Sequence, residues 1–201
     1  MEKSAAPHTL LRRQGTRKRI GVLGAISKDK GLNELKAVVR LAAQRGEAID
    51  FIVIGFTSDD AGILALSTSS TTITVTGRYD HSDVSRLLDE ARLDYGFLPS
   101  VAPETFCYAL SELWAAGVPV LAFDLGAPAE RIRATGAGVL VDRSASAETI
   151  LDALLDAIRR RDELPSSFLE PPPPSSATDL YAGVRRSSQT GMVQDQDGDI
   201  A

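Results

Sequence analysis

The chain has 201 residues, of which 43% are hydrophobic and 24% charged, a composition typical of a globular protein and not of a disordered or fibrous one. Its formal net charge of -5 argues against a general nucleic-acid binder, which would carry a basic surface. No apolar run approaches the roughly 20 residues that span a bilayer, and the first thirty residues lack a signal-peptide core, so the sequence predicts a cytoplasmic protein.

The two ends of the chain differ in composition from its middle. Residues 1–19 hold six Lys or Arg and one Glu, and they lack the apolar face of an interfacial helix. We expect residues 1–18 to be a flexible basic leader, whose charge also suits peripheral contact with the inner face of an anionic membrane. Residues 165–201 run through four consecutive prolines into Ser-rich, acidic sequence, which predicts a disordered tail.

Residues 19–164 alternate short apolar runs with segments of helical periodicity. Strands are expected at 20–23, 51–54, 73–75, 95–98, 118–123 and 138–141. Helices are expected from 32 to about 45, over 84–91, from about 103–105 to 116, and over 147–158. Apolar strands that alternate with helices indicate one α/β domain with a doubly wound parallel sheet of about six strands, covered on both faces.

In such folds ligands bind at the carboxyl ends of the strands, where loops lead into helix N-termini. The first such loop, from Gly24 to Gly31, fits neither the dinucleotide fingerprint nor a P-loop. It holds Lys28 and Lys30 just before a helix and therefore suits a phosphate, because Lys30 adds charge to the positive end of the helix dipole. The alternative is that both lysines are exposed loop residues and Gly31 only a turn.

Two acidic residues, Glu104 and Glu112, follow the strand at 95–98. Pro103 and Thr105 suit a helix start, and on one helix the two carboxylates would be separated by about 12 Å and about 80° of rotation. That arrangement suits recognition of hydroxyl groups on one elongated ligand, whereas the paired carboxylates of glycoside hydrolases lie closer together. The alternatives are a first-turn acid that complements the helix dipole for Glu104 and a surface charge for Glu112, although apolar neighbours favour partial burial of Glu112.

These residues, in this order, resemble the C-terminal, nucleotide-sugar-binding domain of GT-B glycosyltransferases of family 4 over about residues 19–160. The resemblance rests on Lys30 with Gly31, on Glu104 and Glu112 followed by Ala-Ala-Gly-Val-Pro-Val, and on Asp-Leu-Gly-Ala-Pro-Ala-Glu-Arg-Ile at 124–132. The pattern is most similar to bacterial members that build surface polysaccharides such as O-antigen. It implies a Rossmann-like domain of a retaining hexosyltransferase that moves a sugar from a nucleotide diphosphate donor to a glycan or lipid-linked acceptor.

The resemblance also implies roles for single residues. Lys30 would bind the donor diphosphate, Glu112 the ribose hydroxyls, and Glu104 the sugar hydroxyls near the reacting carbon. The other donor-binding positions it implies are Gly24, Lys28, Gly77 and Arg78, the last two with Tyr79 beside the base, and the backbone N–H groups of Thr105, Phe106 and Cys107. No protein nucleophile, cofactor or metal is expected, because cations and helix dipoles stabilise the leaving diphosphate.

Two departures from the family pattern bear on activity. Many members carry an arginine directly after the first-strand glycine, where it partners the lysine on the diphosphate, but this chain has Ala25; Lys28 or Arg78 would have to compensate. A GT-B enzyme also needs an N-terminal domain that binds the acceptor and closes over the donor, and residues 1–18 cannot supply it. The chain is then a fragment of a longer protein, a half-enzyme that pairs with a separate N-domain, or a degenerate remnant.

Other functions remain open at the level of sequence. One is a catalytically inactive nucleotide-binding or protein-interaction module derived from a GT-B domain, and another is a different GT-B reaction such as epimerisation of a sugar nucleotide. Catalysis by His81 or Cys107 is not expected, because Asp80 or Ser82 would cap the helix that follows His81 and Cys107 suits packing. The lone cysteine also excludes an internal disulfide, and with two histidines it does not suffice for a structural zinc site.

Overall fold

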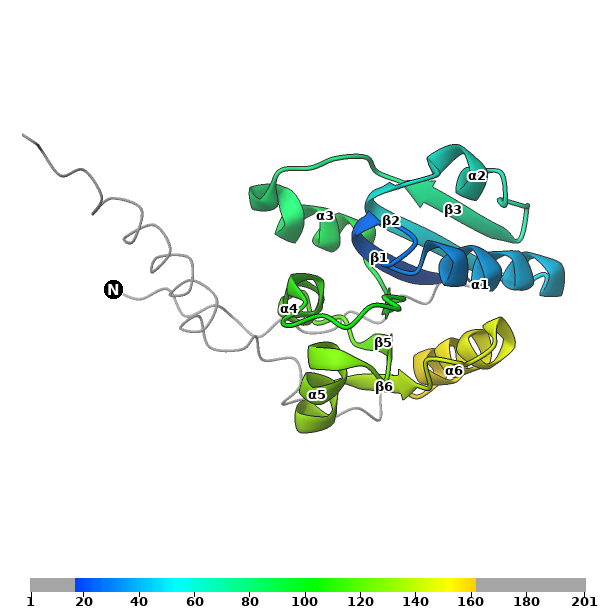
Figure 1. Cartoon of the computed structure of the whole chain (residues 1–201). Coiled ribbons are helices and arrows are strands. Elements are labelled where there is room, and N and C mark those ends of the chain that lie inside the picture. Colours follow the sequence, from blue (N-terminus) through cyan, green and yellow to red (C-terminus); the bar gives the residue numbers. More distant parts are fainter. Residues whose placement is uncertain (1–16, 162–201) are drawn as a thin grey trace, which may run out of the picture. The chain divides into compact units, whose positions relative to one another are not determined.

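A computed structural model describes residues 17–161 of the chain (Figure 1). The first strand begins at Lys18, and Arg17 before it already pairs with a side chain of the fold. The expected basic leader up to residue 16 and the expected tail from residue 165 lie outside the described residues.

Six parallel strands form one sheet in the order β3-β2-β1-β4-β5-β6. Their bounds are Lys18–Ile26 for β1, Ile49–Thr57 for β2, Thr71–Val75 for β3, Tyr95–Leu98 for β4, Val120–Phe123 for β5 and Gly138–Val141 for β6. This order reverses direction between β1 and β4, as in a Rossmann fold. The prediction of a doubly wound α/β domain with about six parallel strands is confirmed.

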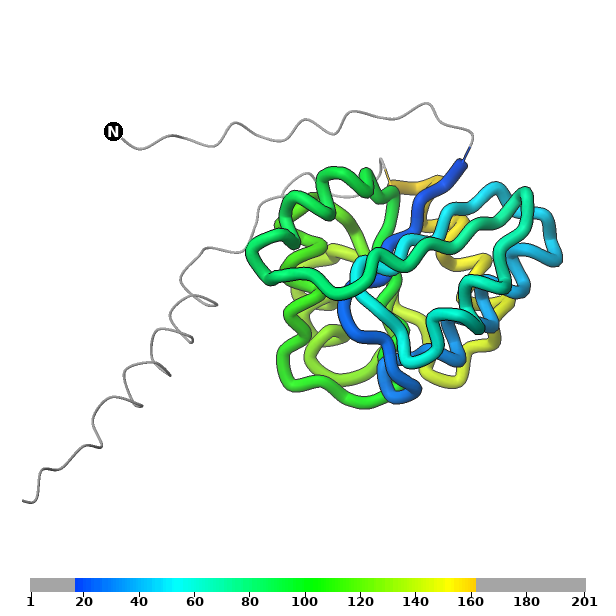
Figure 2. The backbone as a smooth tube through the Cα atoms, turned by 90° about the horizontal axis from the view of Figure 1, so that it is seen from above, coloured from blue at the N-terminus to red at the C-terminus, as the bar shows by residue number. Residues whose placement is uncertain are grey.

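The helices cover both faces of the sheet (Figures 1 and 2). Their bounds are Leu32–Arg45 for α1, Asp60–Leu64 for α2, Val84–Ala91 for α3, Tyr108–Ala115 for α4, Gly126–Thr135 for α5 and Ala147–Arg159 for α6, with a 3-10 turn η1 at His81–Asp83. One apolar cluster packs α1 and α6 against the sheet, and a second packs α3, α4 and α5 against the opposite face. Burial of these two clusters supplies the hydrophobic stabilisation of the fold.

Alternation along the strands assigns residues to these two faces. In β1, Ile20 and Val22 belong to the cluster under α1 and α6, whereas Leu23 belongs to the cluster under α3 and α4. Since neighbouring side chains of a strand point to opposite faces, Ala25 lies on the same face as Leu23. By the same alternation Phe56 of β2 shares the face of Ile54.

Three local features differ from the sequence predictions. Helix α2 was not expected; the Asp59 side chain initiates it by accepting the Gly62 N–H at 3.0 Å. Helix α5 was also missed, because its ten residues include Gly126 and Pro128 and carry little apolar periodicity. Helix α4 begins at Tyr108 and not at residues 103–105, because the preceding residue has a left-handed backbone.

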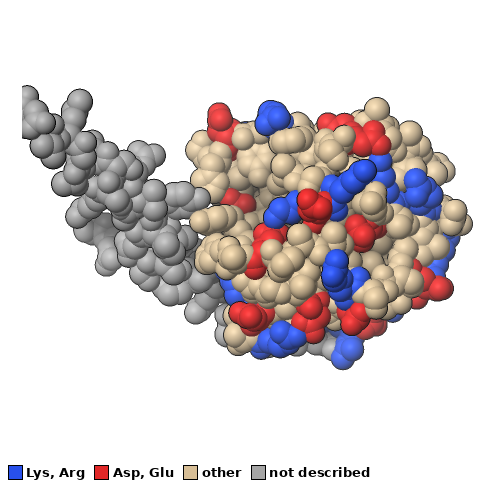
Figure 3. All heavy atoms as spheres, viewed as in Figure 1, with Lys and Arg blue, Asp and Glu red and all other residues tan. Residues whose placement is uncertain are grey.

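The charged side chains seen on one face of the molecule are mixed in sign. Figure 3 shows Lys and Arg interspersed with Asp and Glu among the described residues of that face, without a continuous basic field. No helix within residues 17–161 is long and apolar enough to cross a membrane.

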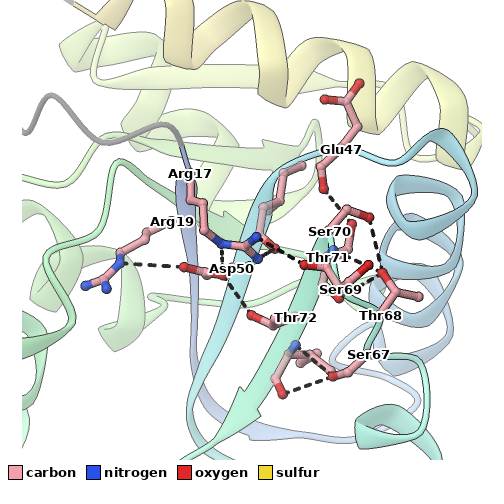
Figure 4. A network of polar contacts seen from close by, with 12 residues as sticks. Arg17, Arg19, Glu47, Asp50, Ser67, Thr68, Ser69, Ser70, Thr71 and Thr72 are labelled. Carbon is pink, nitrogen blue, oxygen red and sulfur yellow. Dashed lines mark hydrogen bonds and ion pairs between the residues drawn. The ribbon is translucent and has the colours of Figure 1, made fainter.

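A polar network joins the amino ends of β1, β2 and β3 (Figure 4). Asp50 lies in register between Arg19 of β1 and Thr72 of β3, and its carboxylate accepts hydrogen bonds of 2.8 Å from Arg17 Nε and Thr72 Oγ1. Burial opposes ionisation of this carboxyl, but the bonds from Arg17 and Thr72 and the charges of Arg17 and Arg19 together lower its pKa. The network therefore ties the residue that precedes β1 to the sheet.

Replacement of Asp50 by Asn is expected to lower the free energy of unfolding by about 1–2 kcal/mol at pH 7, because it leaves Arg17 without its carboxylate. A folded-state pKa below the ordinary 3.8 stabilises the fold above that value and loses the effect as pH falls through the folded pKa. The difference between the wild type and Asp50→Asn in urea unfolding should thus be constant from pH 7 to 5 and shrink below about pH 4. A stability difference between the wild type and Asp50→Asn that does not change with pH would contradict this account. The control is Asp89→Asn, at an exposed position of α3.

Candidate functional site

The loops that follow β1 and β4 meet at the carboxyl edge of the sheet, where the strand order reverses. The carbonyl of Asp29 accepts the N–H groups of Val101 and Ala102 at 3.1 and 3.2 Å. Gly31 has a φ of +83°, and a Cβ there would lie 1.8 Å from the carbonyl oxygen of Pro99. Only glycine fits this close approach, so the turn at Gly31 is a packing requirement that sets where Lys30 projects.

Lys30 and Glu104 are brought together by this contact between loops. The Lys30 Nζ lies 2.8 Å from the Glu104 Oε1, and the side chains are 44% and 19% exposed. Glu104 belongs to an irregular segment before α4, so the expectation that it shares one helix with Glu112, as well as its alternative as a first-turn acid, is wrong. The spacing of about 12 Å based on one helix no longer applies to these two carboxylates.

Cys107 ends that irregular segment as the N-cap of α4 with a φ of +65°, an unusual conformation for a residue with a side chain. Its thiol is buried, and burial together with the neighbouring Glu104 carboxylate raises the pKa of the thiol to about 11. A thiol with that pKa is protonated at neutral pH and is a poor nucleophile. The geometry agrees with packing, and not catalysis, as the role of the Cys107 side chain.

Glu112 lies on α4 and is largely buried, with 19% of its side chain exposed. Burial raises the pKa of its carboxyl, while His81, whose Nδ1 lies 3.2 Å from Oε1, acts in the opposite direction. The expected partial burial is confirmed. The expected capping by Asp80 is wrong, because the Asp80 side chain makes no cap hydrogen bond to η1, and Asp83, not Asp80 or Ser82, is the N-cap residue of α3.

The segment after β3 approaches Glu112 and the end of β2. Burial and the negative charge of Glu112 raise the pKa of Tyr79, which is half-buried. The Arg78 guanidinium carbon lies 4.2 Å from the centroid of the Phe56 ring, and Phe56 pairs in register with Ala25. Arg78 therefore stacks on the strand neighbour of Ala25, the position where many family members carry an arginine.

The other predicted donor-binding residues surround these groups. Gly24 and Gly77 have positive φ values of 112° and 86° at the strand ends. Lys28 is exposed, and its side chain makes no hydrogen bond or ion pair with the residues that the structure describes. Thr105 is exposed, and the ring of Phe106 packs 4.9 Å from that of Tyr108.

Sequence reasoning missed two side chains that act on this edge. The sequence around His81 predicts only a loop, and the contact of His81 with Glu112 depends on a fold that brings η1 to α4. Arg131 of α5 bonds to the segment before α4, and the only signal for it was its place in the Glu-Arg-Ile motif. Within residues 17–161, no group of three or more acidic, His or Cys side chains is arranged to hold a metal ion.

The sequence pattern of the family described as "Glycosyl transferases group 1" matches residues 9–169. This chain belongs to that family. It is a donor-binding domain of the family 4 glycosyltransferases, as its motifs predicted. No curated protein matches the chain.

Solved structures share the fold. HepE of Anabaena, in complex with UDP and glucose, aligns with a TM-score of 0.62 and 15% identity over 87% of this chain and 49% of its own. The C-terminal domain of the group 1 glycosyl transferase LpcC from Francisella tularensis aligns with a TM-score of 0.57 and 22% identity over 77% and 79%. TarM aligns with a TM-score of 0.59 and 18% identity over 82% and 32%. The chain thus spans about half the length of HepE.

We expect Glu112→Gln to increase the free energy of unfolding at pH 7. A carboxyl whose pKa is raised by folding destabilises the folded state once it is ionised, so the neutral amide should remove that cost. Chemical unfolding at pH 7 measures the change, and Glu90→Gln, on the exposed Arg86 pair of α3, is the matched control. A loss of stability in Glu112→Gln would mean that the contacts of the carboxylate outweigh its burial.

Proposed function

We propose that this chain is the donor half of a retaining hexosyltransferase, which transfers a sugar from a nucleoside diphosphate sugar to a glycan or lipid-linked acceptor in the synthesis of a bacterial surface polysaccharide. An N-terminal GT-B domain, in cis or in trans, would bind the acceptor. The observation that carries the proposal is the Lys30 pair with Glu104 at the switch point of the sheet, in a chain of this family.

The diphosphate of the donor would form an ion pair with the ammonium group of Lys30. Lys30 is held 2.8 Å from Glu104, and a phosphate with a larger negative charge would compete for it. The Glu104 carboxylate would then accept hydrogen bonds from hydroxyls of the transferred sugar. The N–H groups of Thr105, Phe106 and Cys107, in the turn before α4, would add donors for the phosphate or sugar oxygens.

The ribose would bind Glu112. An ionised carboxylate with little access to water gains from two hydroxyl donors, and the raised pKa of Glu112 reflects how poorly its surroundings solvate it. The His81 ring is 83% exposed, so it can move away from Glu112 at little cost. Tyr79, beside Glu112, and Gly77 before it would face the nucleoside base.

Arg78 would supply the second cation on the diphosphate in place of the arginine that Ala25 replaces. It stacks on Phe56, the strand neighbour of Ala25, and that contact holds the guanidinium at the carboxyl edge. Lys28 lies in the exposed part of the first loop and is the other candidate.

In the proposed reaction the site would act mainly by electrostatic stabilisation of the leaving group. The bond between the anomeric carbon and the diphosphate oxygen breaks as the acceptor hydroxyl oxygen bonds to that carbon from the same face, and the hydroxyl proton passes to the departing phosphate. Lys30, Arg78 and the amides before α4 would stabilise the charge that accumulates on the diphosphate. No side chain of this chain would form a covalent intermediate.

Solved relatives support a uridine nucleotide as the first donor to test. HepE has been solved with UDP-glucose and with UDP, and S. aureus TarM with UDP. A catalytically inactive nucleotide-binding or interaction module is the second candidate function, favoured by Ala25 at the position of a diphosphate cation.

Calorimetric titration of the purified chain with UDP, GDP, ADP and their sugar conjugates tests the proposal. We expect Lys30→Ala, Arg78→Ala and Glu112→Ala each to weaken binding of the preferred nucleotide about tenfold or more, because each removes a charged hydrogen-bond partner. Arg40→Ala and Glu90→Ala, on exposed helix positions, are charge-matched controls that should bind as the wild type does.

Two results would count against this assignment. If Glu112→Ala and Glu90→Ala are both folded and bind the nucleotide with the same affinity, Glu112 does not bind the ribose as proposed. If the chain binds the nucleotide sugar but transfers no sugar to any acceptor, even after an N-terminal GT-B domain is added, the inactive module would be favoured.

A further inference from the structure

Arg131 of α5 binds the segment that carries Glu104. Its Nη1 donates to the carbonyls of Phe106 and Cys107 at 3.0 and 3.2 Å, and its Nη2 donates to the Ser111 Oγ at 2.8 Å. One planar guanidinium thus joins the two peptide groups before α4 to the first turn of that helix. Lysine could not make these contacts together, because its single ammonium lacks the forked geometry.

The guanidinium is held in place by aromatic rings and by burial. Its carbon lies 4.8 Å from the centroid of the Phe106 ring and 5.1 Å from that of Trp114. Burial lowers the pKa of Arg131, although arginine remains charged at any physiological pH. No carboxylate among residues 17–161 forms a salt bridge with it, which sets it apart from Arg133 on the same helix, whose partner is Asp124. A structural ion pair therefore does not explain this half-buried cation.

The contacts of Arg131 act on a strained backbone. Cys107 has a φ of +65°. The two carbonyls that Arg131 binds lie on either side of the Cys107 Cα: that of Phe106 before it and that of Cys107 itself after it. A non-glycine residue keeps such a conformation only when its surroundings enforce it. In a trans peptide the N–H points opposite to the C=O, so Arg131 turns the N–H groups of Cys107 and Tyr108 away from α5.

The other end of the segment is fixed by the start of α5. Ala127 N–H donates to the Glu104 carbonyl at 3.0 Å, and a Cβ at Gly126 would lie 2.9 Å from that same oxygen. The start of α5 therefore contacts residue 104, and Arg131 in the middle of that helix contacts residues 106 and 107. Glu104 reaches Lys30 from a backbone that is held on both sides by α5.

We propose that Arg131 is a positioning residue of the donor site, which holds residues 104–107 so that the Glu104 carboxylate and the amides before α4 face the diphosphate sugar. The role rests on the proposed function. Arg131 touches neither Lys30 nor the donor; it acts through the peptide groups of Phe106 and Cys107. Its charge also polarises those two peptides, which makes their opposite N–H groups better donors to an anion.

The experiment compares Arg131→Met and Arg131→Lys with Arg133→Met, an exposed change on the same helix. Two measurements are made on each protein: amide hydrogen exchange of Ala127, whose N–H is bonded to the Glu104 carbonyl, and of β1, and calorimetric affinities for UDP-glucose and UMP. UMP lacks the sugar and the second phosphate, so it reports mainly on the ribose end of the site.

Arg131→Met should speed exchange at Ala127 about tenfold or more while exchange in β1 stays unchanged, because a loosened segment frees the Glu104 carbonyl from that amide. Affinity for UDP-glucose should fall about tenfold, that for UMP less than about twofold, and Arg131→Lys should recover little of either loss. Arg133→Met should resemble the wild type in both measurements.

Unchanged exchange at Ala127, or equal losses for UMP and UDP-glucose, would overturn the positioning role. Faster exchange throughout the sheet would also overturn it, since it would reveal a general part in folding. If the wild-type chain bound neither nucleotide, both the proposed function and the role of Arg131 in donor binding would be wrong. The exchange data would still show separately whether Arg131 holds the segment.

Discussion

The candidate site depends on one backbone carbonyl. Asp29 O accepts two amides of the loop after β4, and with the glycine contact at Gly31 it fixes the loop after β1 against that loop. Strands β1 and β4 are neighbours at the point where the sheet order reverses, so their loops diverge to cover opposite faces. The shared carbonyl draws these two loops together, and this sets Lys30 within hydrogen-bond distance of Glu104.

Several groups at this edge lower the stability of the fold in the absence of a ligand. Glu112 is buried with an exposed histidine as its partner, Cys107 has a strained backbone, and Arg131 is a half-buried cation held by carbonyls and rings. Each would be replaced by a simpler arrangement if stability alone decided the sequence. The proposed function would account for these costs, since an anionic ligand with hydroxyl groups would use all three. The Asp50 network at the other end of the sheet differs, because its hydrogen bonds and charges lower the pKa of Asp50 and stabilise the fold.

The sequence predicted the sheet because its strands are almost wholly apolar and alternate with helices, and the motif order predicted the family. Its glycines were poor guides to the strand ends, since β1 and β2 run through Gly24 and Gly55 to Ile26 and Thr57. It could not predict where α4 begins: Pro103 and Thr105 are good helix starters, but the contacts of α5 hold Cys107 in a left-handed conformation, and those contacts come from residues 20 or more positions away. For the same reason the contacts of His81 and Arg131 could not be predicted, since the packing of α3, α4 and α5 determines which residues they meet. The positions of Lys30, Glu104 and Glu112 after strand ends already indicated a site for a phosphate and hydroxyl groups, and the family motif assigned each residue its role. Those donor-binding roles stay predictions.

The central claim is that a nucleoside diphosphate sugar binds at the carboxyl edge of β1 and β4, and a crystal structure of the chain with UDP-glucose tests it most directly. The account predicts the diphosphate against Lys30 and the turn before α4, the sugar hydroxyls on Glu104, and the ribose on Glu112 with His81 displaced. A nucleotide bound elsewhere on the molecule, or one bound at this edge with the Lys30 to Glu104 and His81 to Glu112 contacts intact, would contradict it.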